Sequence, residues 1–254
     1  MQLIVLGSGT SVPHSRRAST SHWLETNGGT LLLDISADAP HRMAEEGLDW
    51  AGLDAIWISH FHLDHSGGLA PYLFGMRSAP QTQQRSKPMN IYAGSGFEPI
   101  LRAFDDANNY KLFKQPFPLT VIELQPEQEF EIFPQLTART FATPHTPESL
   151  AVRLTSSDGR VLVHTSDTGY SMELAEFARG ADLLVMECSF FKDKPVATHL
   201  KLDEALQLAQ AATPRKLLLT HLYEEWDNVD LVAEARKMWD GETVEAHDGL
   251  RLQL

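Results

Sequence analysis

The residues His60-Phe61-His62-Leu63-Asp64-His65 directly follow an apolar run, Asp54–Ser59, that predicts a buried strand. In an extended chain alternate side chains share a face, so His60, His62 and Asp64 are expected to converge on one point. A turn at Asp64 would bring His65 to a neighbouring point. Three imidazoles and a carboxylate within six residues suit borderline divalent metals such as zinc. The two glycines and the apolar helix expected after this stretch argue against a surface cluster of histidines.

Three further polar residues occupy the same kind of position, directly after an apolar run. They are His145 after the expected strand Thr137–Ala142, Asp167 after Val161–Val163, and His221 after Leu217–Leu219. Any one of them alone would more often be a capping residue or a loop histidine. The repetition of the placement indicates that these side chains belong to the same metal site.

This ordered set, H-x-H-x-D-H and then a His, an Asp and a His, resembles the metallo-β-lactamase superfamily over nearly the whole chain. The resemblance implies an α/β fold of the four-layer αββα type, formed by residues 1–254 as a single domain. It also implies two divalent metal ions at one edge of the two sheets. Zinc is favoured, with manganese and iron left open. The implied ligands are His60, His62 and His145 for one ion, Asp64, His65 and His221 for the other, and Asp167 as the bridge between them.

The residue at position 62 bears on the type of chemistry. Diiron members of the superfamily commonly carry Glu there, so His62 favours a hydrolase over an oxygen- or nitric-oxide-reducing enzyme. By this hypothesis the metals lower the pKa of a bridging water, and the metal-bound hydroxide attacks the substrate. Asp64 would both bind metal and hold that nucleophile.

Three local stretches are similar to the ribonuclease Z and phosphodiesterase branch: LGSGTSVPHSRRASTS (6–21), LLVMECSFF (183–191) and ATHLKLDEALQLA (197–209). By this resemblance His199 is the catalytic histidine near the scissile phosphate, and Glu187 orients it. A residue beside a helix start without a chemical role stays an alternative for His199. A structural salt bridge stays an alternative for Glu187, because a buried carboxylate needs a partner.

The chain also departs from true ribonuclease Z. That family inserts a long arm that grips tRNA between the third-motif His and the bridging Asp, whereas His145 and Asp167 are only 22 positions apart. The chain has 21 Lys and Arg against 34 Asp and Glu, a net charge of -13. Because phosphate contacts dominate nucleic-acid affinity, we expect no nucleic-acid partner. His14, Arg16 and Arg17 are either rim residues that meet phosphate or a solvated loop.

The sequence therefore favours a metal-dependent phosphodiesterase that acts on small phosphodiesters, including cyclic ones. A lactonase or thioesterase on the same metals is the first alternative, and ribonuclease Z-like processing of tRNA 3′ ends is the second. Family resemblance also predicts a homodimer. The polar segment Gln81–Lys87 could serve as a lid or as a dimer element.

The sequence gives less information on the cellular location of the protein and on the redox state of its cysteine. The single cysteine, Cys188, cannot form an intrachain disulfide and lies in an apolar run that predicts burial. No apolar run approaches the ~18 residues of a membrane span, and the N-terminus lacks the order of a secretory signal. We expect a cytoplasmic protein without a membrane partner.

Elsewhere the pattern predicts strands and helices as follows. Strands are expected at Gln2–Leu6, Thr30–Ile35, Met89–Ala93, Leu119–Leu124, Phe130–Phe133, Leu150–Leu154, Arg160–Val163, Asp182–Glu187 and Lys216–Thr220. Helices are expected at Ala37–Glu46 with Ser36 as N-cap, Phe97–Ala107, Met172–Ala178, Leu202–Ala212 and Val229–Met238. Ser78–Pro88 is the most loop-like segment.

Overall fold

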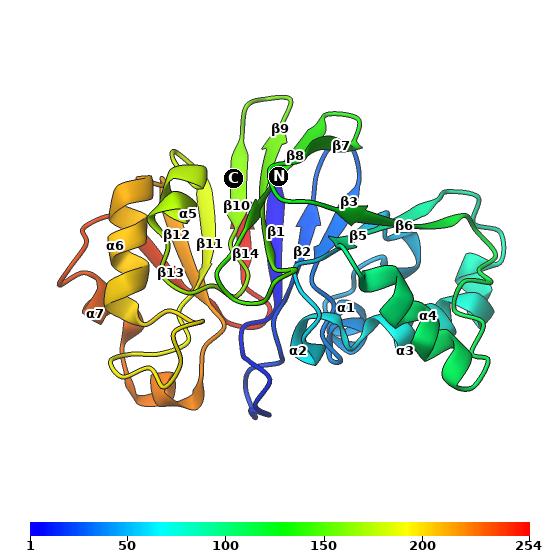
Figure 1. The fold of residues 1–254 in the computed structure, drawn as a ribbon, viewed down its shortest axis with the longest axis horizontal. Coiled ribbons are helices and arrows are strands. Elements are labelled where there is room, and N and C mark those ends of the chain that lie inside the picture. The colour runs from blue at the N-terminus through cyan, green and yellow to red at the C-terminus, as the bar shows by residue number, and fades with distance from the viewer.

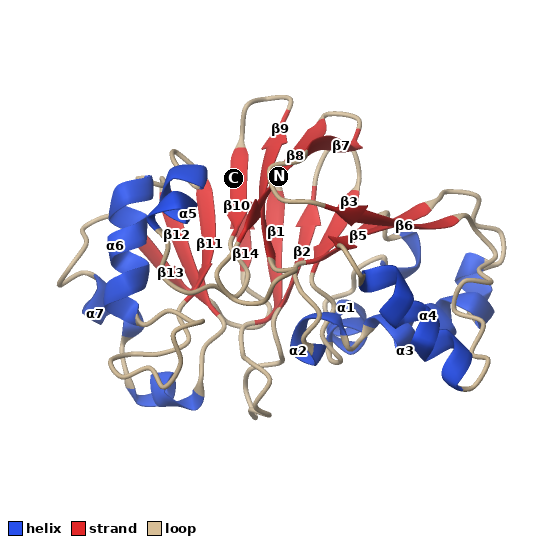
Figure 2. Cartoon of the chain, in the orientation of Figure 1, coloured by secondary structure: helices blue, strands red, loops and turns tan.

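Two seven-stranded sheets face each other, and helices cover the outer face of each, in the computed structural model of residues 1–254 (Figures 1 and 2). The first sheet has the order β14-β1-β2-β3-β4-β5-β6, with β14 Arg251–Gln253, β1 Gln2–Gly7, β2 Ser21–Glu25, β3 Thr30–Leu33, β4 Ala55–Ile58, β5 Met89–Gly94 and β6 Leu119–Leu124. The second has the order β13-β12-β11-β10-β9-β8-β7, with β13 Glu242–Glu245, β12 Lys216–Thr220, β11 Leu183–Glu187, β10 Val161–His164, β9 Leu150–Ser156, β8 Leu136–Ala142 and β7 Glu129–Phe133.

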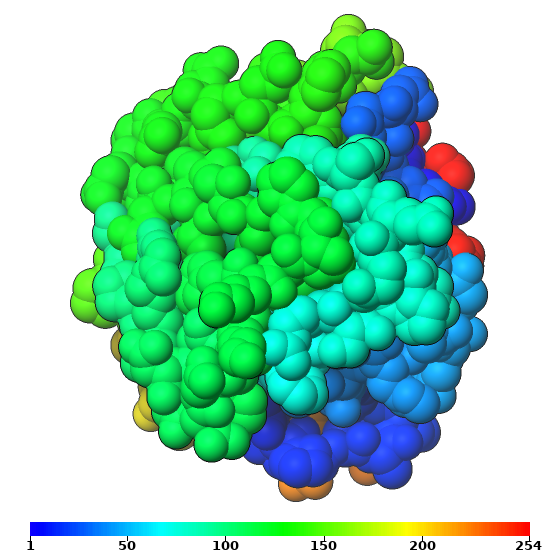
Figure 3. Space-filling view, turned by 90° about the vertical axis from the view of Figure 1, so that its right-hand side faces the viewer, coloured from blue at the N-terminus to red at the C-terminus, as the bar shows by residue number.

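The helices divide between the two outer faces. Those on the side of the first sheet are α1 Ala39–Glu45, α2 Leu63–Ser66, α3 Leu69–Ser78 and α4 Phe97–Ala107; those on the side of the second are α5 Met172–Phe177, α6 Leu202–Ala212 and α7 Leu231–Ala235. Figure 3 shows the outer face that α3 and α4 cover, in cyan and green. None of the helices combines the length and the apolar composition that a membrane span requires.

The alternation of side chains along each strand creates the layers. In β1, Leu3 and Val5 are part of the core between the sheets, whereas Ile4 and Leu6 pack in the core beneath α1, α3 and α4. In β12, Leu218 points between the sheets and its neighbours pack beneath the helices on the other side. The near-continuous apolar strands β1, β4, β11 and β12 are thus buried on both faces, whereas β8 alternates between buried and exposed residues. The four-layer αββα architecture is confirmed.

The strands around the centre of the molecule bring their carboxyl ends to the same edge. Strands β3, β4, β5 and β6 run parallel, as do β10, β11, β12 and β13. Gly68, before α3, allows the chain after β4 to approach the chain after β3, because a Cβ there would lie 2.0 Å from the Ser36 carbonyl oxygen. Residues that follow β3, β4, β10, β11 and β12 therefore meet at this edge.

Several element boundaries were predicted wrongly. Helix α1 begins at Ala39 with Asp38 in the N-cap position, and the Ser36 hydroxyl donates instead to the Ser19 carbonyl. The expected helix Val229–Met238 shortens to α7, because Val229 is extended, the Asp230 carboxylate caps the helix start, and the helix ends at Ala235. Strands β13 and β14 were missed because they are short and largely polar (ETVE and RLQ), which gives no clear strand pattern.

The predicted loop Ser78–Pro88 contains a 3₁₀ turn at Pro80–Thr82 and is pinned at its far end. Arg85 donates to the carbonyl oxygens of Ala51, Leu53, Lys87 and Pro88 and stacks on the ring of Phe117. The segment leads into the amino end of β5, whereas the carboxyl ends lie at the opposite edge of the sheet. It therefore does not cover that edge as a lid. Its role as a dimer element stays a prediction.

Candidate active site

The stretch 60–65 folds differently from the extended segment that the sequence predicted. The chain turns at His62, which occupies the N-cap position of α2, and the Ser66 hydroxyl donates to the His62 carbonyl at 3.0 Å. Asp64 and His65 therefore lie on a helical turn. The prediction that Asp64 converges with His60 and His62 is wrong.

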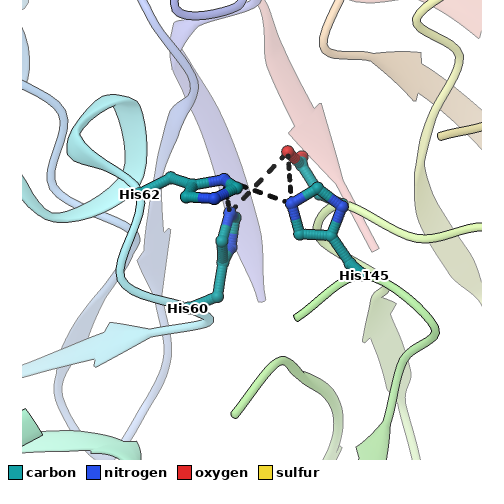
Figure 4. A group of neighbouring side chains, drawn as sticks. His60, His62 and His145 are labelled. Carbon is teal, nitrogen blue, oxygen red and sulfur yellow. Dashed lines mark hydrogen bonds and ion pairs between the residues drawn. The ribbon is translucent and has the colours of Figure 1, made fainter. Parts of the chain in front are cut away.

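The predicted ligands nevertheless gather in two adjoining groups. In each group every residue offers one ligand atom, and these atoms lie within 4.8 Å of one another. The first group is His60, His62, His145 and Asp167 (Figure 4), and the second is Asp64, His65 and His221. His62 contributes Nδ1, which is 3.0 Å from His60 Nε2 and 3.2 Å from His145 Nε2.

Asp167 stands between the two groups. Its Oδ2 lies 3.8 Å from His60 Nε2 and 3.7 Å from His145 Nε2. Its Oδ1 lies 3.3 Å from His65 Nε2 and 3.4 Å from His221 Nε2. Each oxygen of one carboxylate therefore faces one group of imidazoles.

Four of the imidazoles are oriented through Nδ1 by the protein itself. The Nδ1 partners are Ser59 Oγ for His60 at 3.1 Å, Asp34 Oδ2 for His65 at 2.8 Å, the Thr198 carbonyl for His145 at 2.9 Å, and Ser189 Oγ for His221 at 2.9 Å. Nε2 of each ring is left to face the centre. Nε2 of His65 and His221 and Oδ1 of Asp167 are buried without any hydrogen-bond partner. Buried polar atoms are rarely orphaned, and these fit a metal ion.

The sequence did not predict Asp34, which follows β3 within the strand expected at Thr30–Ile35. Asp34 Oδ1 accepts from the Ser59 N–H at 2.7 Å, and its Oδ2 accepts from the Ser59 hydroxyl at 2.9 Å. A carboxylate at the end of an apolar run, in LLLDIS, was the available signal, and it is the same signal that identified Asp167. Its role depends on contacts with the next strand, which the sequence does not display.

Three residues at the candidate centre have a left-handed backbone conformation. Asp34, Ser166 and His221 have φ values of 61°, 53° and 59°, in the left-handed region that side chains other than glycine rarely adopt. All three are buried. Such strain persists only where surrounding contacts enforce it, and it is typical of functional sites.

The electrostatics of the centre follow from burial and from Asp167. Burial raises the pKa of the Asp167 carboxyl, but His221 and His65 outweigh it and hold that pKa well below its usual range. Burial likewise opposes a charge on His65, but Asp167 and Asp34 raise the pKa of His65 well above its usual value. Burial lowers the pKa of His60 strongly, and the neighbouring His65 adds to the effect. The centre therefore concentrates negative charge on Asp167 among imidazoles.

Glu187 and His199 are in direct contact beside the centre. His199 Nδ1 donates to Glu187 Oε1 at 2.9 Å. Burial lowers the pKa of His199, but this hydrogen bond and the Glu187 charge raise it above its usual value. His199 Nδ1 also lies 3.9 Å from Asp167 Oδ2, which makes His199 a geometric alternative ligand together with His221. Because Nδ1 donates to Glu187, that nitrogen has no lone pair for a metal.

The basic residues of the loop between β1 and β2 form ion pairs within the protein. His14, Arg16 and Arg17 all lie within ion-pair distance of Asp227, which follows His221 in the chain. This shared partner holds the loop against the segment after β12. The expectation of free phosphate-binding cations at the rim is not supported, and neither is a purely solvated loop. The predicted burial of Cys188 is confirmed.

Comparison with known proteins places the fold. The Anti-Pycsar protein Apyc1 family matches residues 1–240. The probable metallo-hydrolase YhfI of Bacillus subtilis is 27% identical over 98% of each chain, and its crystal structure superposes with a TM-score of 0.82 over 99% of this chain and 98% of that one. Ribonuclease Z of Archaeoglobus fulgidus is 24% identical over 100% of this chain and 97% of its own. A diphosphatase of the PhnP family shares the fold, with a TM-score of 0.77, 22% identity and coverage of 100% and 97%.

Proposed function

This chain belongs to the Anti-Pycsar protein Apyc1 family and is a metal-dependent hydrolase with the metallo-β-lactamase fold. We propose that it uses two divalent metal ions to hydrolyse small phosphodiesters, including cyclic ones. The observation that carries the proposal is the position of Asp167, whose two oxygens face two separate groups of imidazoles. One bridging carboxylate offsets the repulsion between two cations held ~3.5–4 Å apart.

In this proposal the two groups hold one ion each. The assigned ligands are His60, His62 and His145 for the first, Asp64, His65 and His221 for the second, and Asp167 for both. Zinc suits a set of five imidazoles and two carboxylates best, and manganese or iron is the alternative. When bound, the metal pair would lower the pKa of a water and neutralise charge on the phosphate oxygens.

The chain's own residues would supply the proton and the orientation. His199 is anchored on Glu187 through Nδ1, so Nε2 is the nitrogen available to the substrate. Its raised pKa keeps His199 protonated further into the neutral range, where it can donate to the leaving oxygen. Asp64 would orient the attacking water with its carboxylate, in addition to binding metal.

A small substrate fits better than tRNA. A single hairpin, β9 and β10, fills the interval between His145 and Asp167, so no arm projects there. The net charge of -13 opposes a polyanion, and the rim cations are already paired with Asp227. A lactonase or thioesterase would use the same metals but would not need His199 and Glu187.

The first test is a substrate panel on metal-free protein reloaded with zinc or manganese. We expect turnover of bis-(p-nitrophenyl) phosphate and of cyclic mononucleotides, none in metal-free protein, and little on lactones, thioesters or precursor tRNA. His199→Ala should lower kcat at least ~100-fold with full metal content. His41→Ala, at an exposed histidine on α1, is the matched control. Full phosphodiesterase turnover in His199→Ala would remove its catalytic role, and turnover on lactones alone would replace the proposed substrate class.

We also propose that residues 1–254 act as one domain, because side chains of both sheets form one shared core. The homodimer and the cytoplasmic location stay predictions. Size-exclusion chromatography with light scattering tests the former.

A further inference from the structure

Ser189 lies between a candidate metal ligand and the Glu187–His199 pair. Its hydroxyl donates to Glu187 Oε2 at 2.7 Å and lies 2.9 Å from Nδ1 of His221. Ser189 is 0% exposed and Glu187 is 1% exposed. Buried polar atoms such as these depend on one another for their hydrogen bonds.

The direction of the hydrogen bonds follows from the number of donors. Each oxygen of Glu187 accepts a backbone N–H, Oε1 from Thr168 at 2.7 Å and Oε2 from Leu200 at 3.0 Å. A carboxylate held by such donors accepts and does not donate. The single hydrogen of the Ser189 hydroxyl therefore goes to Glu187. Toward His221 the hydroxyl is left as an acceptor, so Nδ1 of that ring carries a hydrogen.

This hydrogen has a consequence on the other side of the ring. A neutral imidazole protonated at Nδ1 has its lone pair on Nε2. Nε2 of His221 is buried, lacks a hydrogen-bond partner, and lies 3.4 Å from Asp167 Oδ1 and 3.5 Å from Asp64 Oδ2. We propose that Ser189 is a positioning residue that fixes the tautomer and orientation of His221 and so makes Nε2 available to a divalent metal ion. The inference builds on the metal centre of the proposed function.

The two aspartates explain why such a residue is needed. Without Ser189, Nδ1 of His221 would have no hydrogen-bond partner among the side chains around it. The hydrogen could then move to Nε2, where Asp64 and Asp167 would accept it. That tautomer satisfies the imidazole but places a hydrogen where the metal ion has to bind. By holding the hydrogen on Nδ1, Ser189 keeps the lone pair of Nε2 available to the metal ion.

The test compares Ser189→Ala, which removes the hydroxyl, with Ser189→Thr, which keeps it. Thr140→Val is the matched control, because the buried Thr140 hydroxyl bonds only to the Gln125 and Gln128 segments beside β8. The first measurement is the zinc affinity of each protein by competition with a chromophoric chelator. The second is ¹⁵N NMR of the His221 ring in metal-free protein, assigned with a His221→Gln variant.

We expect Ser189→Ala to bind one of two zinc ions ~10-fold to 100-fold more weakly, with Ser189→Thr near wild type and Thr140→Val unchanged. Metal-free wild type should show His221 protonated at Nδ1, and Ser189→Ala should show a mixture of tautomers. Unchanged affinity in Ser189→Ala, or a wild-type His221 protonated at Nε2, would overturn the proposal. If Ser189→Ala does not fold, the wild-type spectrum alone decides. Neither readout involves a substrate, so failure of the phosphodiesterase proposal would leave this result interpretable.

Discussion

Two carboxylate–serine pairs support the candidate metal centre, one from each sheet. On the first sheet, Asp34 and Ser59 follow β3 and β4. Asp34 accepts directly from His65, and Ser59 lies against His60 while its hydroxyl donates to Asp34. Both imidazoles that this pair holds are candidate ligands, one in each group. In the proposed centre, the imidazoles that this pair contacts are all candidate metal ligands.

On the second sheet, Glu187 and Ser189 use the same chemistry for a different purpose. Ser189 reaches one candidate ligand, His221, while Glu187 accepts directly from His199. His199 belongs to neither main group of ligands. We therefore propose that the first pair orients metal ligands only, whereas the second connects a metal ligand to the residue that we assign to proton transfer. Variants of the two pairs should therefore fail in different ways.

The largest effect is expected for Asp34→Asn. The amide cannot accept from both His65 and Ser59 as the carboxylate does, so one ligand of each group loses its orientation. We expect at least ~100-fold weaker binding of both metal ions and loss of turnover, measured as zinc content after dialysis against a chelator. Asp49→Asn, at a carboxylate that caps a 3₁₀ turn away from the centre, should retain zinc. Two tightly bound zinc ions in Asp34→Asn would show that the Asp34–Ser59 pair is not needed for metal binding.

Glu187→Gln should fail differently. The Gln side chain lacks the charge that supports protonated His199, while its oxygen can still accept from the Ser189 hydroxyl, so we expect kcat to fall ~100-fold while two zinc ions remain bound. KM and kcat on bis-(p-nitrophenyl) phosphate, measured together with zinc content, separate the two cases. A loss of zinc as large as that of Asp34→Asn would mean that the second pair, too, serves only the metal centre.

The same contrast explains what the sequence could predict. Four strand-end positions, one of them the start of the H-x-H-x-D-H stretch, indicated a shared metal site, and the resemblance to the metallo-β-lactamase superfamily supplied the set of seven candidate ligands. The strand and helix patterns fitted two sheets between outer helices, and the resemblance implied the four-layer αββα arrangement. Ser59 and Asp34 were not identified, because a serine beside a histidine and an aspartate inside an expected strand have no distinctive spacing. Their importance comes from contacts between β3, β4 and α2, which form only in the fold.

Ser59→Ala provides a smaller and more local test. Its hydroxyl accepts from Ser166 at 2.6 Å as well as lying against Nδ1 of His60. Its loss leaves Asp34 and His65 in contact, so we expect only the ion of the His60 group to bind ~10-fold more weakly. Cobalt titration monitored by absorbance distinguishes the two sites. If Ser59→Ala and Ser189→Ala weaken the same ion, the assignment of ligands to two groups needs revision.

The smallest effect concerns two imidazoles that no such pair supports. His22 on β2 and His164 on β10 are buried with their rings 5.4 Å apart, and both nitrogens of His22 lack a hydrogen-bond partner. Burial lowers the pKa of both rings, and for His22 the neighbouring His164 lowers it further. Since an unsatisfied buried polar group costs free energy, His22→Leu should raise the free energy of unfolding of metal-free protein by about 1 kcal/mol at pH 8.

The pH dependence gives the sharper measurement. Below pH ~6.5 the unfolded chain takes up a proton at His22 that the folded protein excludes, so this residue makes stability fall as the pH falls. His22→Leu removes one such group, and its stability should decline less steeply, by up to about 1.4 kcal/mol per pH unit. Urea unfolding at pH 8 and pH 5.5 measures the difference, with His41→Leu on the surface as control. If the free energy of unfolding of wild type and of His22→Leu depended on pH in the same way, His22 would bind a proton in the folded state as it does in the unfolded chain. Burial without a partner would then not lower the pKa of His22.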